Sequence, residues 1–106
     1  PRGFEWLVKD DGQNAVIAFK RYSFSGSYLI CVCNFSPERQ VDYVLGVDEH
    51  GEYEEIFSSD AEEFGGAGER NEIMHSLIMN KNGKTNAIRV TLPANSSIIL
   101  RKIQKN

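Results

Sequence analysis

Few residues of this 106-residue chain are of types that carry chemistry. The two cysteines, Cys31 and Cys33, lie two positions apart in an apolar run. On a strand their Cα atoms would be about 6.5 Å apart with parallel side chains, a geometry that suits a disulfide poorly. We therefore predict two buried free thiols that act as small hydrophobic residues, as in a reducing, cytoplasmic protein. The histidines, His50 and His75, stand alone in expected loops, so we predict no metal site and no cofactor.

Acidic pairs and a glycine-rich loop are the other candidates for chemistry. The pairs are Asp10-Asp11, Glu54-Glu55 and Glu62-Glu63. Because neighbouring residues point to opposite faces of a strand, neither carboxylate pair of a strand can flank one scissile bond, and we interpret all three as solvated surface charge. The loop Gly65-Gly66-Ala67-Gly68 lacks the Gly-Lys-Ser/Thr ending of a phosphate-binding loop. The residues themselves therefore predict no catalytic site.

Composition sets limits on the partners of the chain. Twelve basic and fifteen acidic residues give a net charge of −3, and no basic cluster is present. This argues against nucleic acid and against an anionic membrane as partners. Hydrophobic residues make up 41% and charged residues 25%, which is ordinary for a globular domain, and no apolar run approaches the roughly 18 residues of a membrane helix.

The segment that must organise the fold is Tyr28–Pro37, the most hydrophobic run in the chain. Both of its alternating faces are apolar, which predicts a strand in the middle of a sheet with both faces covered. Alternating patterns predict five further strands and a short edge strand: Ala15–Tyr22, Val41–Val47, Glu52–Ser58, Asn86–Leu92, Ser96–Ile103 and, at the edge, Leu77-Ile78-Met79. Roughly six to eight short strands with no helical period predict an all-β, antiparallel sandwich or barrel.

The alternation also predicts which side chains point inward. Val41, Tyr43, Leu45 and Val47 are expected on one face of their strand. Tyr53 and Phe57 are expected together on one face of the next strand, with Ile56 on the other. Ile88, Val90 and Leu92 are expected to point inward.

Aromatic residues gather in the first segment, where Phe4, Trp6 and Leu7 stand close together. Such a cluster near a terminus is expected to pack on something. Three interpretations remain open: packing against the domain's own sheet, packing against a partner domain, and stacking of Trp6 on a sugar ring.

Four segments together resemble the C-terminal domain of bacterial 1,4-α-glucan (glycogen) branching enzymes, members of the α-amylase superfamily. The family pattern contains Gly-Phe-x-Trp-Ile/Leu, Cys/Ser-Asn-Phe-Thr-Pro, Trp-x-Glu-hydrophobic-Leu-Asn-Thr-Asp with Tyr-Gly-Gly-Ser, and Leu-Thr-Leu-Pro-Pro. The corresponding segments follow one another in the same order: Gly3–Leu7, Val32–Pro37, Tyr53–Asp60 with Phe64–Gly68, and Val90–Pro93 followed by Ile98–Leu100. The resemblance thus spans nearly the whole chain.

The chain departs from the family pattern at several positions. Tyr53 stands where the family usually has Trp, Ser58-Ser59-Asp60 replaces Asn-Thr-Asp, Phe64 replaces Tyr, Ala67 replaces Ser, and Pro93-Ala94 replaces Pro-Pro. The family assignment does not depend on any one of them.

The resemblance implies a Greek-key-like β-sandwich behind a catalytic (β/α)₈ barrel. It implies a division into residues 1–14, a linker segment from the barrel, and residues 15–106, the C-terminal sandwich. The parent enzyme would cleave α-1,4 links and re-attach the chain by an α-1,6 link, in glycogen biosynthesis. The nucleophile and the acid/base of the family lie on the barrel, so no catalytic residue carries over to this chain. Phe4, Trp6 and Leu7 correspond to the join between barrel and C-terminal domain.

Three hypotheses follow. The first is a non-catalytic domain that packs on and stabilises the barrel, whose substrate is α-glucan. The second is an autonomous α-glucan-binding module that uses Trp6. The third is self-association of the isolated chain through the surface that the barrel would cover.

Overall fold

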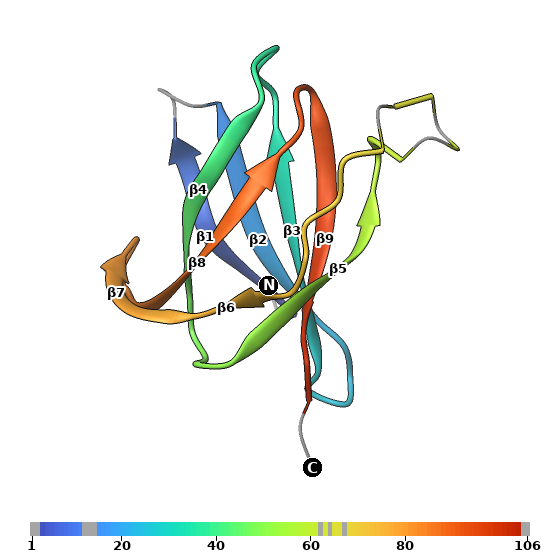
Figure 1. The fold of residues 1–106 in the computed structure, drawn as a ribbon. Coiled ribbons are helices and arrows are strands. Elements are labelled where there is room, and N and C mark those ends of the chain that lie inside the picture. Colours follow the sequence, from blue (N-terminus) through green and yellow to red (C-terminus); the bar gives the residue numbers. More distant parts are fainter. Residues whose placement is uncertain (1–2, 12–14, 62, 64, 67, 105–106) are drawn as a thin grey trace.

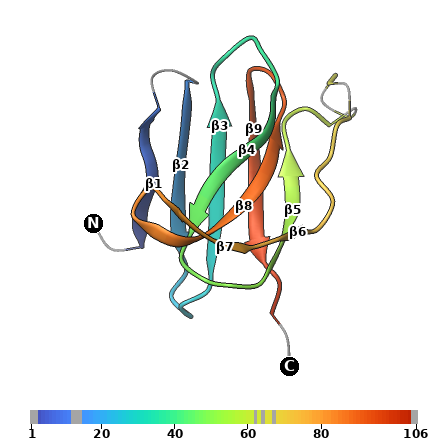
Figure 2. The same ribbon diagram turned by 60° about the vertical axis from the view of Figure 1, so that its left-hand side comes forward.

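The strands form two stacked antiparallel sheets in a computed structural model that describes residues 3–11, 15–61, 63, 65–66 and 68–104. The larger sheet has the strand order β1-β2-β3-β9-β5-β6 and the smaller sheet has the order β4-β8-β7. In Figures 1 and 2, β4 and β8 cross in front of β2, β3 and β9. The nine strands among these residues are β1 Phe4–Asp11, β2 Val16–Tyr22, β3 Tyr28–Asn34, β4 Gln40–Val47, β5 Glu52–Ser58, β6 Met74–His75, β7 Leu77–Lys81, β8 Lys84–Leu92 and β9 Ser96–Lys102. The predicted all-β sandwich is confirmed.

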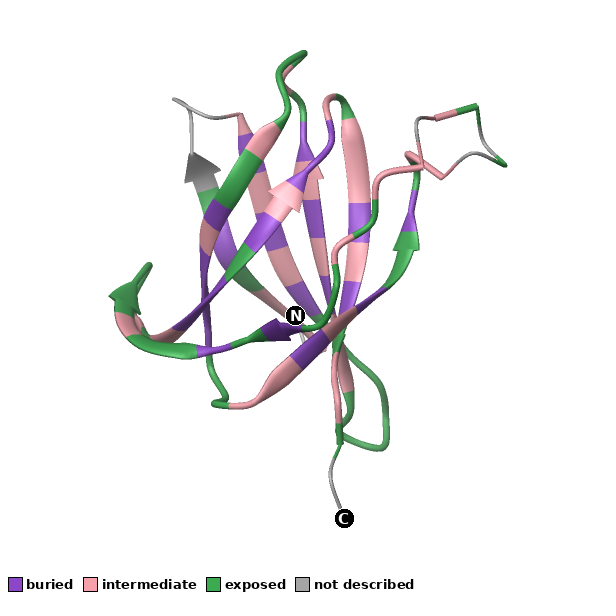
Figure 3. Ribbon diagram, viewed as in Figure 1, coloured by how far each residue is buried: buried purple, intermediate pink, exposed green. Residues whose placement is uncertain are grey.

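The core lies between the two sheets, where every second residue of a strand points inward. Figure 3 shows this as buried bands that alternate along the strands. On β8, Ile88, Val90 and Leu92 are all buried, as predicted. They face the inner side chains of the larger sheet, which include Val16, Ala18, Ile30, Val32, Ile98 and Leu100.

The predicted central strand is β3, which lies between β2 and β9. Its inner face is buried at Ile30 and Val32, but the prediction that both faces are covered is wrong. Leu29, Cys31 and Cys33 on the outer face are only half-buried, since no layer of this chain packs over that side. The larger sheet therefore presents an apolar outer face.

Two β-bulges change the predicted side-chain directions. Asp42 has a positive φ of 53°, and the register shifts between Gln40 and Tyr43, so Val41 is 59% exposed while Tyr43 is buried. On β5 the register shifts between Glu55 and Phe57. An extra residue in one strand reverses the alternation beyond it, so Tyr53 is buried and Phe57 is exposed. The predicted common faces of Val41 with Tyr43, and of Tyr53 with Phe57, are wrong for this reason.

Strand β1 occupies most of the segment that was expected to be a linker, residues 1–14. It pairs antiparallel with β2 and forms one edge of the larger sheet. The expected boundary at residue 15 therefore does not coincide with the edge of the sheet, while residues 1–2 and 12–14 lie outside the described part. The described residues contain no helix that could span a membrane.

Candidate functional site

One row of large apolar side chains crosses the outer face of the larger sheet. Trp6 of β1 lies opposite Phe19 of β2, Phe19 opposite Cys31 of β3, Cys31 opposite Ile99 of β9, and Ile99 opposite Phe57 of β5. Residues directly opposite each other in an antiparallel sheet share a face and contact one another. We call these five residues the outer row. Trp6 is 42% and Phe57 is 40% exposed, and the three residues between them are half-buried.

The β1 end of the outer row is a packed aromatic cluster. Phe4 stacks on Phe19 with ring centroids 5.0 Å apart, and Trp6 meets Phe4 edge-to-face at 5.1 Å and Phe19 at 5.9 Å. Aromatic pairs of this geometry contribute roughly 0.5–1.5 kcal/mol each beyond buried area. The cluster thus packs on its own sheet and still leaves Trp6 partly exposed to a partner.

Leu7 does not share that surface. It is 5% exposed and belongs to the core between the sheets, because the register of β1 shifts between Trp6 and Val8. Of the three residues predicted for an interdomain contact, Phe4 and Trp6 thus lie on the outer face and Leu7 points inward. The sequence pattern did not indicate Phe19, Ile99 and Phe57 as members of the same surface. The apolar side chains on both alternating faces of β2 and β9 are the signal that could have found the first two.

Charged residues border the outer row at one end of the sheet. Arg21 lies opposite Phe4, and Arg101 donates two hydrogen bonds to Glu54, of 3.1 and 2.8 Å. An apolar centre with a polar rim is the usual composition of a protein–protein interface.

The two cysteines lie on this outer face as free thiols, as predicted. Burial raises the pKa of Cys31, the neighbouring Cys33 raises it further, and Arg21 opposes the shift. Cys31 is therefore a protonated, weakly nucleophilic thiol at neutral pH. The Ser97 hydroxyl donates to Cys33 Sγ at 3.2 Å, so the pair is part of the packed surface and not a reactive site.

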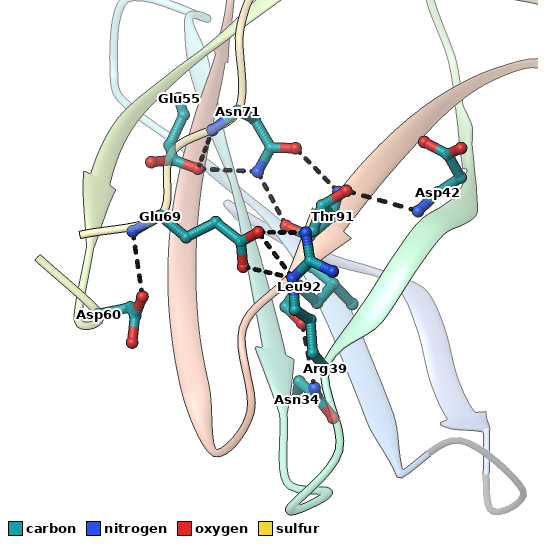
Figure 4. A network of polar contacts seen from close by, with 9 residues as sticks. All are labelled: Asn34, Arg39, Asp42, Glu55, Asp60, Glu69, Asn71, Thr91 and Leu92. Atoms are coloured by element: carbon teal, nitrogen blue, oxygen red, sulfur yellow. Dashed lines mark hydrogen bonds and ion pairs between the residues drawn. The ribbon is translucent and has the colours of Figure 1, made fainter. Parts of the chain in front are cut away.

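A polar network at one end of the sandwich ties the glycine-rich loop to β5 and β8 (Figure 4). The side-chain amide of Asn71 donates to Glu55 Oε1 and to the Thr91 carbonyl, each at 2.9 Å, and its oxygen accepts from the Thr91 amide at 2.8 Å. The Glu55 carboxylate is 1% exposed, and its Oε2 lies 3.0 Å from Arg70 Nε. Because a buried carboxylate is costly without partners, these contacts hold the loop in place.

Tight backbone turns shape the same loop. Gly68 N donates to the Asp60 carbonyl at 2.8 Å, and a Cβ at Gly66 would lie 2.1 Å from that oxygen. Arg39 on the far side forms an ion pair with Glu69. Phe64 and Ala67 of the family-like segment lie outside the described residues. The glycines are thus required by a close backbone approach, which agrees with the prediction of a surface loop.

A second charged cluster closes the opposite end of the sandwich. Asp48 Oδ2 accepts from Lys20 Nζ and its Oδ1 pairs with Lys84 Nζ, both at 2.7 Å, and Lys84 also binds Glu5 Oε2 at 2.7 Å. Burial acts to raise the pKa of Asp48, but the two lysines outweigh it and hold the pKa below its ordinary value. The cluster joins β1 and β2 of the larger sheet to β8 of the smaller one.

The histidines lie close together near β6. His50 Nδ1 is 3.0 Å from the Ser76 hydroxyl, and His75 Nδ1 is 3.1 Å from Glu52 Oε2. Across the described part of the chain, no group of three His, Cys, Asp or Glu residues is arranged to hold a metal ion.

The fold and the ordered motifs can now be compared with known proteins. The family model of the alpha amylase C-terminal all-beta domain matches residues 6–103, and the chain belongs to this family. It is similar to the 1,4-alpha-glucan branching enzymes GlgB of Halothermothrix orenii (37% identical over 97% of this chain), Photobacterium profundum (36% over 94%) and Prochlorococcus marinus strain NATL1A (39% over 98%). The matched regions are 17%, 14% and 14% of the lengths of these relatives, so the chain corresponds to a small part of each.

Proposed function

We propose that this chain is the non-catalytic C-terminal domain of a 1,4-α-glucan branching enzyme and that its outer row packs on the catalytic barrel of that enzyme. The barrel would cleave α-1,4 links and re-attach the chain by α-1,6 links in glycogen biosynthesis. The domain would stabilise the barrel and contribute no catalytic group. A cytoplasmic location goes with this function, and two free thiols support it.

The observation that carries the proposal is the outer row itself. Five apolar side chains from five adjacent strands lie side by side with no layer of the described chain above them. Exposed apolar patches of this kind mark interaction sites. Trp6 and Phe57 stand at opposite ends of the row, so a partner that covers both must span the sheet.

The experiment is a binding measurement between this chain and the separately expressed catalytic domain of the proposed parent enzyme. Replacement of Trp6 or Phe57 by Ser is expected to weaken binding at least tenfold, because buried aromatic residues dominate interface energies. The matched control is Ile78→Ser, since Ile78 is 88% exposed but lies on β7 of the other sheet.

Full binding by Trp6→Ser and Phe57→Ser would overturn the proposal. So would an equal loss in Ile78→Ser, because it would move the contact to the smaller sheet. Circular dichroism of each variant separates loss of binding from loss of fold.

A further inference from the structure

A hollow lies at the end of the sandwich where β9 leaves the sheet. Its volume is about 390 Å³, and it is lined by the β2–β3 connection and by the chain at the end of β9. Figures 1 and 2 show both segments extending from the same end of the sheet. This volume is within the roughly 300–1,000 Å³ of small-molecule pockets, at the lower end. The hollow is separate from the centre of the outer row.

Two tyrosine rings form one wall of the hollow. The rings of Tyr22 and Tyr28 are 5.7 Å apart and inclined at 53°, and Tyr22 is 36% exposed. Behind them, the buried Lys20 ammonium lies 4.8 Å from the Tyr22 centroid and 4.1 Å from the Tyr28 centroid. Asp48 fixes Lys20 at 2.7 Å, and the Tyr28 hydroxyl donates to Glu49 at 2.6 Å. The rings are therefore held in place before any ligand binds, which lowers the entropic cost of binding.

Polar groups of the kind that bind hydroxyls complete the lining. Arg21, Arg101 and Gln104 offer planar groups of N–H donors, and Ser27 offers a hydroxyl. Arg101 is already oriented by its two hydrogen bonds to Glu54. An aromatic wall beside hydroxyl-binding donors suits a pyranose ring, which has an apolar C–H face and a rim of hydroxyls.

We propose that this hollow is a binding site for an α-1,4-linked glucan chain, in which Tyr22 forms the platform for one glucose ring and Arg21, Arg101 and Gln104 bind its hydroxyls. The identity of the sugar rests on the proposed function. The site would hold substrate on the C-terminal domain itself and keep a glucan chain near the barrel.

A neighbouring hollow gives the bound chain a path. It has a volume of about 470 Å³ and shares Lys102 and Gln104 with the first. Its other lining residues include His50, Glu52, His75 and Ser76, which offer further hydrogen-bonding groups. Two adjoining hollows can hold more than one sugar ring, so affinity should rise with the number of glucose units. A carboxylate in the second hollow favours a neutral chain over a polyanion.

The test is calorimetric titration of this chain with maltose and maltoheptaose. We expect saturable binding that is several-fold tighter for maltoheptaose and at least tenfold weaker in Tyr22→Ala. The matched control is Phe24→Ala, because Phe24 is fully exposed in the same connection but does not line the hollow. Phe24→Ala and Trp6→Ala should both bind like the unaltered chain.

Three results would overturn the site. They are no binding of maltoheptaose, binding that Trp6→Ala abolishes while Tyr22→Ala does not, and binding of inorganic phosphate that displaces maltoheptaose. Because no catalytic domain is present, failure here leaves the packing of the outer row untouched. Retained binding in Trp6→Ser with lost barrel binding would separate the two surfaces directly.

Discussion

Asn71 is the residue at which the loop of residues 59–71 is most firmly attached to the sandwich. Its side chain makes three hydrogen bonds of 2.8 to 2.9 Å, to Glu55 and to the backbone of Thr91. Intramolecular hydrogen bonds contribute about 1 kcal/mol each, and a buried group left without its partner costs more. Asn71→Ala is therefore expected to lower the free energy of unfolding by about 2–3 kcal/mol in urea titrations.

The control for this prediction is Asn80→Ala, which removes an exposed amide from β7. It should change the free energy of unfolding by less than about 0.5 kcal/mol, as surface substitutions usually do. Equal effects in the two variants would show that the network of Figure 4 does not hold the loop.

Gly46 offers a second prediction for a single residue. A Cβ on Gly46 would lie 2.2 Å from the Lys81 carbonyl oxygen, which belongs to the backbone of β7. Gly46→Ala must therefore move β4 away from β7, at a cost of about 1–3 kcal/mol or more. Gly26→Ala is the comparison, since it has open space around it but a positive φ of 88°. Gly26→Ala should cost about 1–2 kcal/mol in thermal or urea unfolding through backbone strain alone, with β4–β7 contacts unchanged by NMR.

Among the elements, the charged cluster around Asp48 makes stability depend on pH in a defined direction. The pKa of Asp48 is lowered despite burial, because Lys20 and Lys84 bind its charged form. Its contribution to stability is therefore complete above the ordinary pKa of 3.8 and is lost as pH falls through the lower folded value. Burial opposes the charged forms of Lys20 and Lys84, but Asp48 raises the pKa of both, so their contribution is complete below 10.5 and is lost above it.

Urea unfolding from pH 2 to pH 7 checks the acid limb. The unaltered chain should lose stability below about pH 4, and Asp48→Asn should show a smaller loss over the same range because the titrating group is gone. The same acid dependence in both chains would place the responsible carboxylates elsewhere. Glu54→Gln is the matched control, since its ion pair with Arg101 is exposed and such pairs contribute little.

The sequence predicted elements better than side-chain directions. The periods of alternating residues located β2, β3, β4, β5, β8 and β9, because a two-residue period survives in any half-buried strand. The bulges at Asp42 and after Glu55 could not be foreseen, since no Gly or Pro marks them and an extra residue reverses every later side chain. The outer row could not be predicted for the same reason, because it depends on register between strands far apart in the sequence. Trp6 and Phe4 were predictable only as an aromatic cluster.

At the scale of the whole molecule, the two sheets differ in what covers them. The inner faces bury each other, while the larger sheet leaves the outer row open along five strands. The strand edge of β1 is a weaker place for association, because the strand is bulged at two points and carries charges such as Glu5 and Lys9. Bulges and charges on an edge strand hinder edge-to-edge pairing. The face, not the edge, is therefore where a second copy would bind.

This asymmetry predicts weak self-association of the isolated chain through its outer rows. Light scattering should give an average mass that rises above the monomer value with concentration, because apolar surface removed from water contributes about 25 cal/mol per Å². The double variant with Trp6→Ser and Phe57→Ser should stay monomeric, whereas Ile78→Ser should associate like the unaltered chain. The separately expressed catalytic domain should compete with self-association, since both partners would cover the same five residues. A chain that stays monomeric at its highest soluble concentration would show that the outer row does not pair with itself. Association that the catalytic domain leaves unchanged would place the two contacts on different faces, and the packing proposed for the outer row would then be wrong.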